Sequence, residues 1–339
     1  MPRKLYCTVS SLEEIFIFKE GIHADLNTIV LTHRYIALDI TDEQLIESQA
    51  GLNPVIMELM SLGTFRISCE PKLFEDFESN FSTQDGNSVF IINESNARCQ
   101  ELSEEYGCCV LSQDNLTTAS QLTDKVTYRQ LIANQVLKDS SCAPPRVGWQ
   151  VWLKDLPRLP MNSLVLIDNY ILKDIESRSN VYPLLDAILP IKLKIEFHLL
   201  IVTRCGRGWA PGILKEFISK TIADLNRPYT IKLGVLTHFE DKEFHNRAFV
   251  TGMHIGTSEH GFAAFKGDKA KSNNNIRIEA LFSDINKLGS DTPWISMGVE
   301  LNSTADLLRK NKRGNGLVTT NIHFETFEDC DNRLLKILN

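Results

Sequence analysis

The chain has 339 residues, of which 43% are hydrophobic and 23% are charged, as in an average soluble globular protein. This length is sufficient for two domains of ordinary size, each with its own core. The formal net charge of −7 excludes a nonspecific nucleic-acid binder that depends on overall positive charge. No apolar run approaches the roughly 18 to 20 residues that span a bilayer, so we expect no membrane span and a cytoplasmic location.

The eight cysteines are scattered along the chain and form no Cys-x-x-Cys pair. The adjacent Cys108 and Cys109 are too close for ordinary disulfide bridging or for tetrahedral zinc binding. This usage predicts reduced, buried thiols in a cytosolic protein.

The first third of the chain predicts α/β structure. Residues 27–40 predict one or two strands, and residues 41–63 predict a helix that is broken near Pro54. Thr41 and Gln44 have the spacing of a capping box at the start of that helix.

Residues 87–116 predict a strand, a helix and a second strand. Residues 90–92 form the first buried strand, Ser95 caps the helix, and Gly107 ends it. Residues 109–111 then resume the sheet. Because parallel strands need such a crossover, this segment indicates a parallel sheet.

A proline-rich segment over residues 137–163 divides the chain. It holds four of the twelve prolines, and its Pro-Pro pair cannot sit inside a helix or a central strand. We therefore expect an N-terminal α/β domain over residues 1–140, a linker over 141–162 and a second domain over 163–339.

Strands and helices alternate regularly after the linker. Two short strands around a turn that contains Gly252 follow this alternation. Parallel strands with right-handed crossovers share the edge formed by their carboxyl ends, where open α/β sheets bind ligands. The predicted strands cover residues 163–172, 196–209 and 230–239, and the predicted helices cover 181–190 and 210–228.

Several residues that can hold a phosphate are expected at this edge. Histidine can attack phosphorus or transfer a proton near neutral pH. Guanidinium groups bind phosphate oxygens in bidentate fashion, and small hydroxyls add donors beside backbone N–H groups. Taken singly, each residue also fits an ordinary structural or surface role. The candidates are Asp168, Tyr170, Arg204 and Arg207 after the parallel strands, His245 and Arg247 on one face of the next strand, and Thr257 and Ser258 beyond it.

The order of these pieces resembles one half of the phospholipase D superfamily. The resemblance covers residues 163–283, about a third of the chain. The family motif is His-x-Lys-x-x-x-x-Asp followed by a Gly-Ser turn, and this sequence has "HNRAFVTG" followed by "IGTSEHGF". The strand "VLIDNYIL", which contains Asp168, is similar to the Asp-x-Tyr strand of compact members. The resemblance implies a sheet with flanking helices and chemistry that needs no metal.

The match places His245 at the nucleophile position and Arg247 at the lysine position. Gly252 stands where the motif has its aspartate, and Thr257 and Ser258 take the place of the Gly-Ser turn, closer to the histidine than in the full motif.

These departures bear on activity. Active members pair two motifs, within one chain or across a dimer, so that one histidine forms the phosphohistidine and the other protonates the leaving group. A second copy is missing here, because the segment "THRYIALD" has His33 and Asp39 but a tyrosine at the lysine position and the wrong spacing. An enzyme would therefore need a homodimer. The lost aspartate and the exchange of lysine for arginine favour a degenerate site that binds rather than cuts.

The N-terminal part is similar, more weakly, to PIN-type nucleases, whose carboxylates hold Mg²⁺. Two of the candidate carboxylates equally suit the first turn of a helix, and another suits a capped loop. The histidines at 238, 245, 254 and 260 match no familiar metal signature, so we expect no metal and no cofactor. The carboxylates that carry this weaker resemblance are Asp39, Asp42, Glu43 and Asp114.

The densest basic run is "RKNKR" over residues 309–313. Such runs are usually solvated loops, and this one is also open to a nucleic-acid contact.

The sequence thus predicts a cytoplasmic, non-catalytic or weakly catalytic subunit that recognises nucleic acid or another phosphodiester. A bacterial defence or mobile-element assembly is the context in which such degenerate modules recur, by analogy with the fold class. Two alternatives remain open at this point. One is a homodimeric, metal-independent phosphodiesterase that uses His245, and the other is an adaptor that contacts proteins or a membrane surface.

Overall fold

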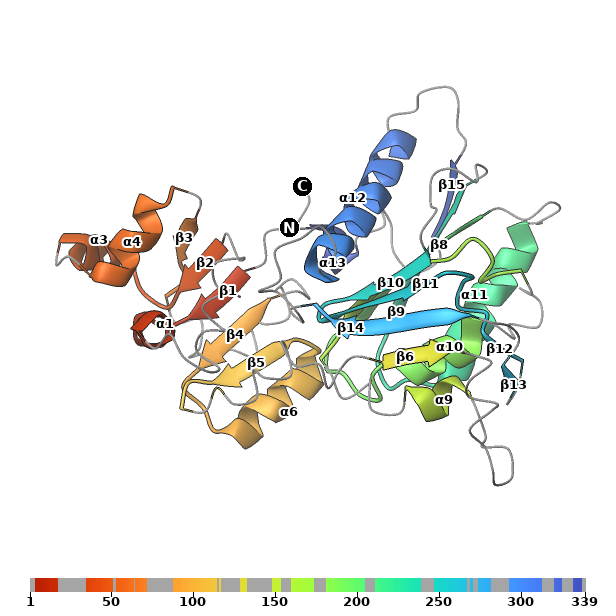
Figure 1. Cartoon of the computed structure of the whole chain (residues 1–339), viewed down its shortest axis with the longest axis horizontal. Helices are drawn as coiled ribbons and strands as arrows, with labels where there is room; N and C mark the ends of the chain where they lie inside the picture. The colour runs from red at the N-terminus through yellow and green to blue at the C-terminus, as the bar shows by residue number, and fades with distance from the viewer. Residues whose placement is uncertain are drawn as a thin grey trace.

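The computed structural model is a mixed α/β protein with two main β-sheets, arranged side by side along its long axis (Figure 1). The part of the chain that the structure describes comprises residues 4–17, 35–50, 53–63, 65–71, 88–114, 116, 129–132, 148–153, 160–173, 181–204, 211–238, 247–266, 269–270, 274–281, 293–312, 320–324 and 332–336.

The first sheet is entirely parallel and has five strands in the order β3-β2-β1-β4-β5. The pairing of the last two strands confirms the parallel sheet expected from residues 87–116. Its central strands are buried apolar runs, and the rings of Tyr6 and Phe90 stack with their centroids 4.5 Å apart. The strands are β1 (Lys4–Cys7), β2 (Tyr35–Leu38), β3 (Arg66–Cys69), β4 (Val89–Ile92) and β5 (Cys109–Ser112).

Four helices in the described part of the chain accompany this sheet, and the three predicted signals at their ends are confirmed. The backbone N–H of Thr41 donates to Gln44 Oε1 at 2.8 Å, and the N–H of Gln44 donates to Thr41 Oγ1 at 3.2 Å, which forms the capping box. Ser95 accepts the N–H of Arg98, and Gly107 ends the last helix in the left-handed conformation. These helices are α1 (Val9–Ile17), α3 (Asp42–Ala50), α4 (Pro54–Ser61) and α6 (Asn96–Tyr106).

The second sheet has eight strands in the order β15-β9-β8-β7-β10-β11-β14-β6. Its three central strands β7, β8 and β9 run parallel, as expected, and the remaining pairs are antiparallel. A small separate hairpin is formed by β12 (Phe265–Lys266) and β13 (Lys269–Ala270). The eight strands are β6 (Arg129–Ile132), β7 (Ser163–Ile167), β8 (Phe197–Arg204), β9 (Ile231–His238), β10 (Arg247–Thr251), β11 (His254–Ser258), β14 (Asn275–Ala280) and β15 (Thr320–Phe324).

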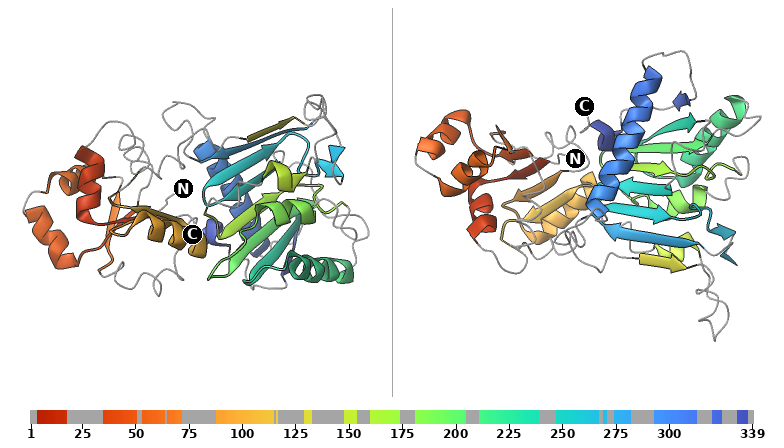
Figure 2. Two further views of the ribbon diagram at one scale, coloured as in Figure 1. Left: turned by 90° about the horizontal axis from the view of Figure 1, so that it is seen from below. Right: turned by 45° about the horizontal axis from the view of Figure 1, so that its top comes forward.

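Helices cover both faces of the eight-stranded sheet (Figure 2). The face that carries Leu164 and Leu166 packs against α9 (Trp149–Trp152), α10 (Val181–Ile188) and α11 (Pro211–Leu225). The face that carries Val165 and Ile167 packs against α12 (Pro293–Lys312) and α13 (Arg333–Lys336). Among the described helices, the 20-residue α12 included, none is long and apolar enough to cross a membrane.

The two sheets are joined by direct contacts at the amino-terminal edge of β7. Asn162 donates through Nδ2 to the carbonyl of Tyr106 at 2.9 Å, and the N–H of Lys194 donates to the carbonyl of Glu105 at 2.7 Å. One continuous cluster of buried apolar residues also runs from the first sheet to the α12 face of the second. Strand β6 precedes the proline-rich segment but pairs with β14, so the second sheet takes a strand from the amino-terminal side of the expected linker.

Replacing Gly107 with alanine should test the junction between the sheets. Its φ is +62°, and a Cβ there would overlap the backbone carbonyl of Met161. Gly63 is a matched control, because its φ is +61° and a Cβ would meet nothing within 4 Å. Both variants should lose about 1 to 2 kcal/mol from the left-handed backbone, and Gly107→Ala should lose about 1 to 3 kcal/mol more from overpacking.

Urea unfolding of the two variants measures this difference directly. Equal losses in both variants would mean that the close approach of Gly107 to β7 contributes nothing to stability.

Candidate functional site

The order of the strands brings distant parts of the chain together at the carboxyl edge of the eight-stranded sheet. After β9 the chain does not continue outward. It crosses back, and β10 pairs antiparallel with β7 on the side opposite β8, with Ala248 facing Ile167. The start of β10 therefore lies beside the end of β7, and the end of β11 lies beside the start of β10.

A row of polar side chains crosses five neighbouring strands at this edge. Thr237 on β9 pairs with Thr203 on β8. On the next strand across the sheet, Asp168 follows the end of β7, and its N–H donates to the carbonyl of Val202, the residue before Thr203. Asp168 adjoins Arg247, which pairs with Ser258. Because side chains alternate along each strand, all five point to the face that carries α10 and α11. We call these five residues the polar row.

Asp168 is the buried centre of the polar row. Its side chain is 0% exposed, and both carboxylate oxygens accept backbone N–H groups, Oδ1 from Tyr170 at 2.8 Å and Oδ2 from Phe262 at 2.6 Å. Gly261, at φ +94°, lies so close that a Cβ there would come within 2.7 Å of Oδ2. Two strongly bound N–H groups hold the carboxylate at a fixed position.

The pKa of the Asp168 carboxyl is raised, because burial disfavours the charged form. The two backbone N–H groups and the positive charge of Arg247 act in the opposite direction and are outweighed.

A second set of hydrogen bonds fixes the turn after β11. Ser258 donates through Oγ to the carbonyl of Gly261 at 2.7 Å and also lies 3.1 Å from Asn274 Oδ1. Asn274 donates through Nδ2 to the same carbonyl, and its Oδ1 accepts the N–H of His260 at 3.2 Å. With Ser258 and Asn274 buried, this network holds the turn against the carboxylate of Asp168.

Arg247 supplies the positive charge of the polar row. Its guanidinium carbon lies 5.4 Å from the centre of the Tyr170 ring, and Nη1 donates to the carbonyl of Glu259 at 2.7 Å. Its Nε is buried and makes no hydrogen bond to the described residues, as is also true of Thr203 Oγ1. The guanidinium is therefore held in orientation while part of its donor capacity is left over.

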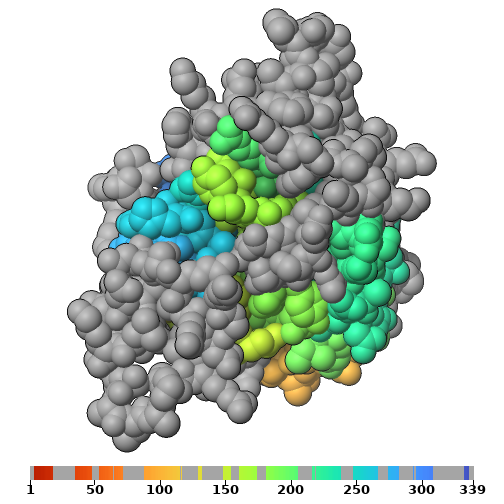
Figure 3. Space-filling view, turned by 90° about the vertical axis from the view of Figure 1, so that its right-hand side faces the viewer, coloured from red at the N-terminus to blue at the C-terminus, as the bar shows by residue number. Residues whose placement is uncertain are grey.

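Such an arrangement is suited to an anion with several oxygens. A fixed guanidinium can donate to phosphate oxygens, whereas the Ser258 hydroxyl and the turn N–H groups of His260 and Phe262 already donate within the protein. The surface of this edge is seen in Figure 3, where the yellow-green segment 160–173 lies beside the cyan segment 247–266.

The structure brings together four of the residues expected from the sequence, Asp168, Tyr170, Arg247 and Ser258. Two others are in different positions. Arg204 follows Thr203 on β8 and Thr257 precedes Ser258 on β11, so alternation places both side chains on the opposite face of the sheet. The nucleophile candidate His245 and the second arginine, Arg207, lie outside the described residues.

Sequence reasoning missed several parts of this site. Asn274 and Gly261 hold the turn, and Thr203 and Thr237 extend the polar row. The sequence signal for both threonines was a polar residue near the end of an apolar strand. The role of Asn274 depends on a contact with a residue 13 positions away, which has no local pattern.

The four carboxylates considered for a metal form no metal site among the described residues. Asp39, Asp42, Glu43 and Asp114 are all described, yet the described part of the chain contains no group of three or more His, Cys, Asp or Glu side chains placed to hold a metal ion. The carboxylates of Asp42 and Glu43 stand in the first turn of α3, the alternative role expected for them.

The expectation of a loop for the basic run is wrong for most of its residues. Helix α12 extends to Lys312, so residues 309–312 are helical. Leucine, lysine and arginine are good helix formers, and they carry the helix on from its buried part.

The comparisons with known proteins give no family. No protein-family model matches this chain, and no curated protein matches it either.

Replacing Asp168 with asparagine should destabilise the protein by about 1 to 3 kcal/mol, because the new amide NH₂ would face one of the two backbone N–H donors. The loss should also depend on pH. The folded pKa of Asp168 is raised, so its contribution is complete below the ordinary aspartate pKa of about 4 and is lost as the pH rises through the folded value.

Denaturant unfolding of the wild type and Asp168→Asn between acid and neutral pH measures this difference. The advantage of the wild type should shrink as the pH rises. Glu101→Gln is a control whose stability difference from the wild type should change with pH in the opposite direction, because Arg98 lowers the pKa of the Glu101 carboxyl. A pH-independent difference for Asp168→Asn would show that its carboxyl titrates alike in the folded and unfolded chain.

Proposed function

We propose that the eight-stranded sheet is a degenerate phospholipase D-like module that binds a phosphodiester group of nucleic acid at the polar row. The observation that carries the proposal is the placement of Arg247 beside Asp168 and Ser258 at one sheet edge. A phosphate there would receive its donors from the guanidinium of Arg247.

The element order supports the resemblance. Three parallel strands joined by helices are followed by an antiparallel hairpin, β10–β11, and the arginine at the motif's lysine position begins that hairpin. Strand β7, which ends just before Asp168, pairs with β10, so the two sequence segments on which the resemblance rests are neighbours.

Binding without cleavage is the favoured activity. Gly252 supplies no carboxylate at the motif's aspartate position, and Arg247 replaces a lysine that has a different donor geometry. A single histidine at position 245 gives one proton-transfer group where the reaction uses two. Asp168 does not replace the missing acid, because its side chain is buried and held in place by two backbone N–H groups.

A single-stranded nucleic acid is the ligand that best suits the surroundings of Arg247. The ring of Tyr170 is 42% exposed and lies against the guanidinium. An exposed aromatic ring beside a phosphate donor can stack a nucleobase while the backbone is held. The overall charge of −7 gives little nonspecific attraction to a duplex.

We place this activity in a cytoplasmic subunit of a larger assembly. A single polar row holds one or two phosphates, which gives weak binding, and other subunits would supply the rest of the affinity. The five-stranded parallel sheet would act as a scaffold for these partners. A bacterial defence or mobile-element system is the context suggested by analogy with the fold class.

Arg247→Ala should weaken binding of a fluorescent single-stranded oligonucleotide about tenfold, a loss of about 1.4 kcal/mol, and should reduce the salt dependence by about one released ion. Arg247→Lys should fall between wild type and alanine, because it keeps the charge but loses bidentate contact. Arg66→Ala is a matched control: that exposed guanidinium lies 5.3 Å from the Tyr35 ring on the other sheet. Anisotropy titrations at several salt concentrations provide the readout, and equal affinities of the two alanine variants would refute the site.

The enzymatic alternative makes a different prediction. A homodimeric phosphodiesterase would cleave DNA or RNA in the presence of EDTA and lose this activity in His245→Ala. We expect the pure wild type to bind without such cleavage. EDTA-resistant cleavage that disappears in the variant, together with a dimer in solution, would replace the binding proposal. An adaptor would show neither nucleic-acid binding nor cleavage.

A further inference from the structure

The helices of the five-stranded sheet expose an unusual number of apolar side chains. Ten large apolar residues are exposed in the described part of the chain, and half of them lie on α1, on α3, or on α4 and the turn after it. Ile17 is 66% exposed and Ile46 is 63% exposed. A concentration of this kind on one region marks an interaction surface more often than scattered single residues do. The five residues are Ile17, Ile46, Met57, Met60 and Leu62.

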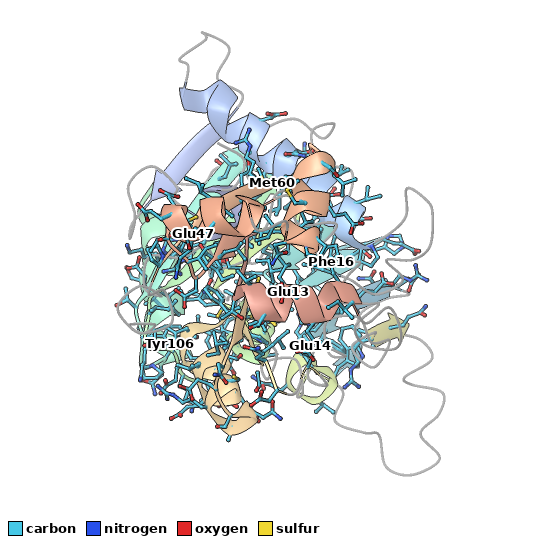
Figure 4. All side chains as sticks on the ribbon, turned by 90° about the vertical axis from the view of Figure 1, so that its left-hand side faces the viewer. Glu13, Glu14, Phe16, Glu47, Met60 and Tyr106 are labelled. Carbon is cyan, nitrogen blue, oxygen red and sulfur yellow. The ribbon has the colours of Figure 1, made fainter. Side chains whose placement is uncertain are left out.

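These three helices form one face of the molecule. Helix α4 packs against both α1 and α3, and Asn53 at the start of α4 donates through Nδ2 to Glu13 Oε1 at 2.7 Å. Figure 4 looks onto this face, with Glu13, Glu14 and Phe16 on α1 and with Glu47 and Met60 on the neighbouring helices. We call the surface of α1, α3 and α4 the acidic helical face.

The charge on this face has one sign. The sequences of α1, α3 and α4 contain six carboxylates and no lysine, arginine or histidine. In the chain as a whole, 36 basic residues accompany 43 acidic ones, so a run of three helices without a basic residue departs from the average. The carboxylates are Glu13, Glu14, Asp42, Glu43, Glu47 and Glu58.

Charge and apolar character together select the partner. Carboxylates repel nucleic acid and anionic lipid surfaces, and a membrane-surface helix would instead carry lysine or arginine beside its apolar residues. A second copy related by a two-fold axis would place the same carboxylates against each other. A partner segment with both apolar and basic side chains would cover the exposed apolar residues without bringing like charges together.

We propose that the acidic helical face is the docking site for a basic amphipathic helix of a protein partner. Met57 and Met60 are one turn apart on α4, at 42% and 48% exposure, and their flexible thioethers can adapt to the apolar stripe of such a helix. Glu47 on α3 and Glu58 on α4 flank them and face the basic residues at its margins. This inference is independent of the polar row, which lies at the carboxyl edge of the other sheet.

The test uses a fluorescein-labelled synthetic peptide of 18 leucine and lysine residues arranged as an amphipathic helix, titrated with the full chain. The control peptide has the same composition in a scrambled order without a helical stripe. We expect saturable binding of the amphipathic peptide and binding of the scrambled peptide weaker by about tenfold or more. The result should be the same for Arg247→Ala, which separates this surface from phosphodiester binding.

Two double variants identify the surface. Met57→Gln/Met60→Gln removes apolar contact without changing charge, and should weaken peptide binding by about tenfold or more. Glu47→Gln/Glu58→Gln should weaken binding and flatten its salt dependence. Val151→Gln/Ile191→Gln is the matched control, because both residues are exposed apolar side chains elsewhere, and it should bind as the wild type does. All the replaced side chains are exposed, so unfolding free energies should remain close to the wild-type value.

Several results would overturn the inference. One is equal binding of the two peptides, and another is binding that Met57→Gln/Met60→Gln leaves unchanged. A dimer in sedimentation that this variant abolishes would assign the face to a second copy of the chain. Stronger binding to phosphatidylserine vesicles than to the peptide, lost in the same variant, would assign the face to a membrane.

Discussion

A single buried carboxylate ties the first parallel strand of the eight-stranded sheet to a turn 94 residues further along the chain, through the hydrogen bond from the Phe262 N–H to Asp168. A buried carboxylate without such partners would cost several kcal/mol, so its position requires that both backbone donors be present. The Tyr170 donor is local, whereas the Phe262 donor is present only if β10 pairs with β7 and the chain turns back after Ser258. The strand order, the turn and the orientation of Arg247 are thus parts of one constraint.

This constraint also decides what the edge of the sheet can do. Asp168 is buried and accepts two backbone N–H groups, so it organises the site from beneath the surface and is not exposed to a ligand. The Tyr170 ring and the Glu259 carbonyl hold the Arg247 guanidinium in one orientation. The direction of its remaining N–H groups is therefore set by the protein. A guanidinium held in this way loses little side-chain entropy when an anion arrives. Such preorganisation is the physical reason for assigning binding to this edge.

The sequence carries most of the local structure of this protein and only part of its site. Thr41 and Gln44, Ser95 and Gly107 mark helix ends by interactions within a few residues, and the structure confirms each of them. The parallel strands follow from the alternation of apolar runs and helices. The site depends on register, which is set across the sheet. One residue of shift along β8 or β11 exchanges Thr203 for Arg204, or Ser258 for Thr257, and no local pattern fixes that choice. The contacts of Asn274 with His260 and Gly261 join residues far apart in the sequence, so no local pattern predicts them either.

The distribution of charge reconciles an acidic chain with the anion binding that we propose at this edge. The net charge of −7 describes the molecule as a whole, whereas the carboxylates of α1, α3 and α4 lie on the five-stranded sheet. The amino-terminal edge of β7 rests against α6 of that sheet, so the polar row at the carboxyl edge of β7 faces away from it. Exposed charges separated by more than about 10 Å of salt solution are largely screened from each other. The acidic helical face therefore does little to repel a phosphate at Arg247, and the two surfaces can engage unlike partners at the same time.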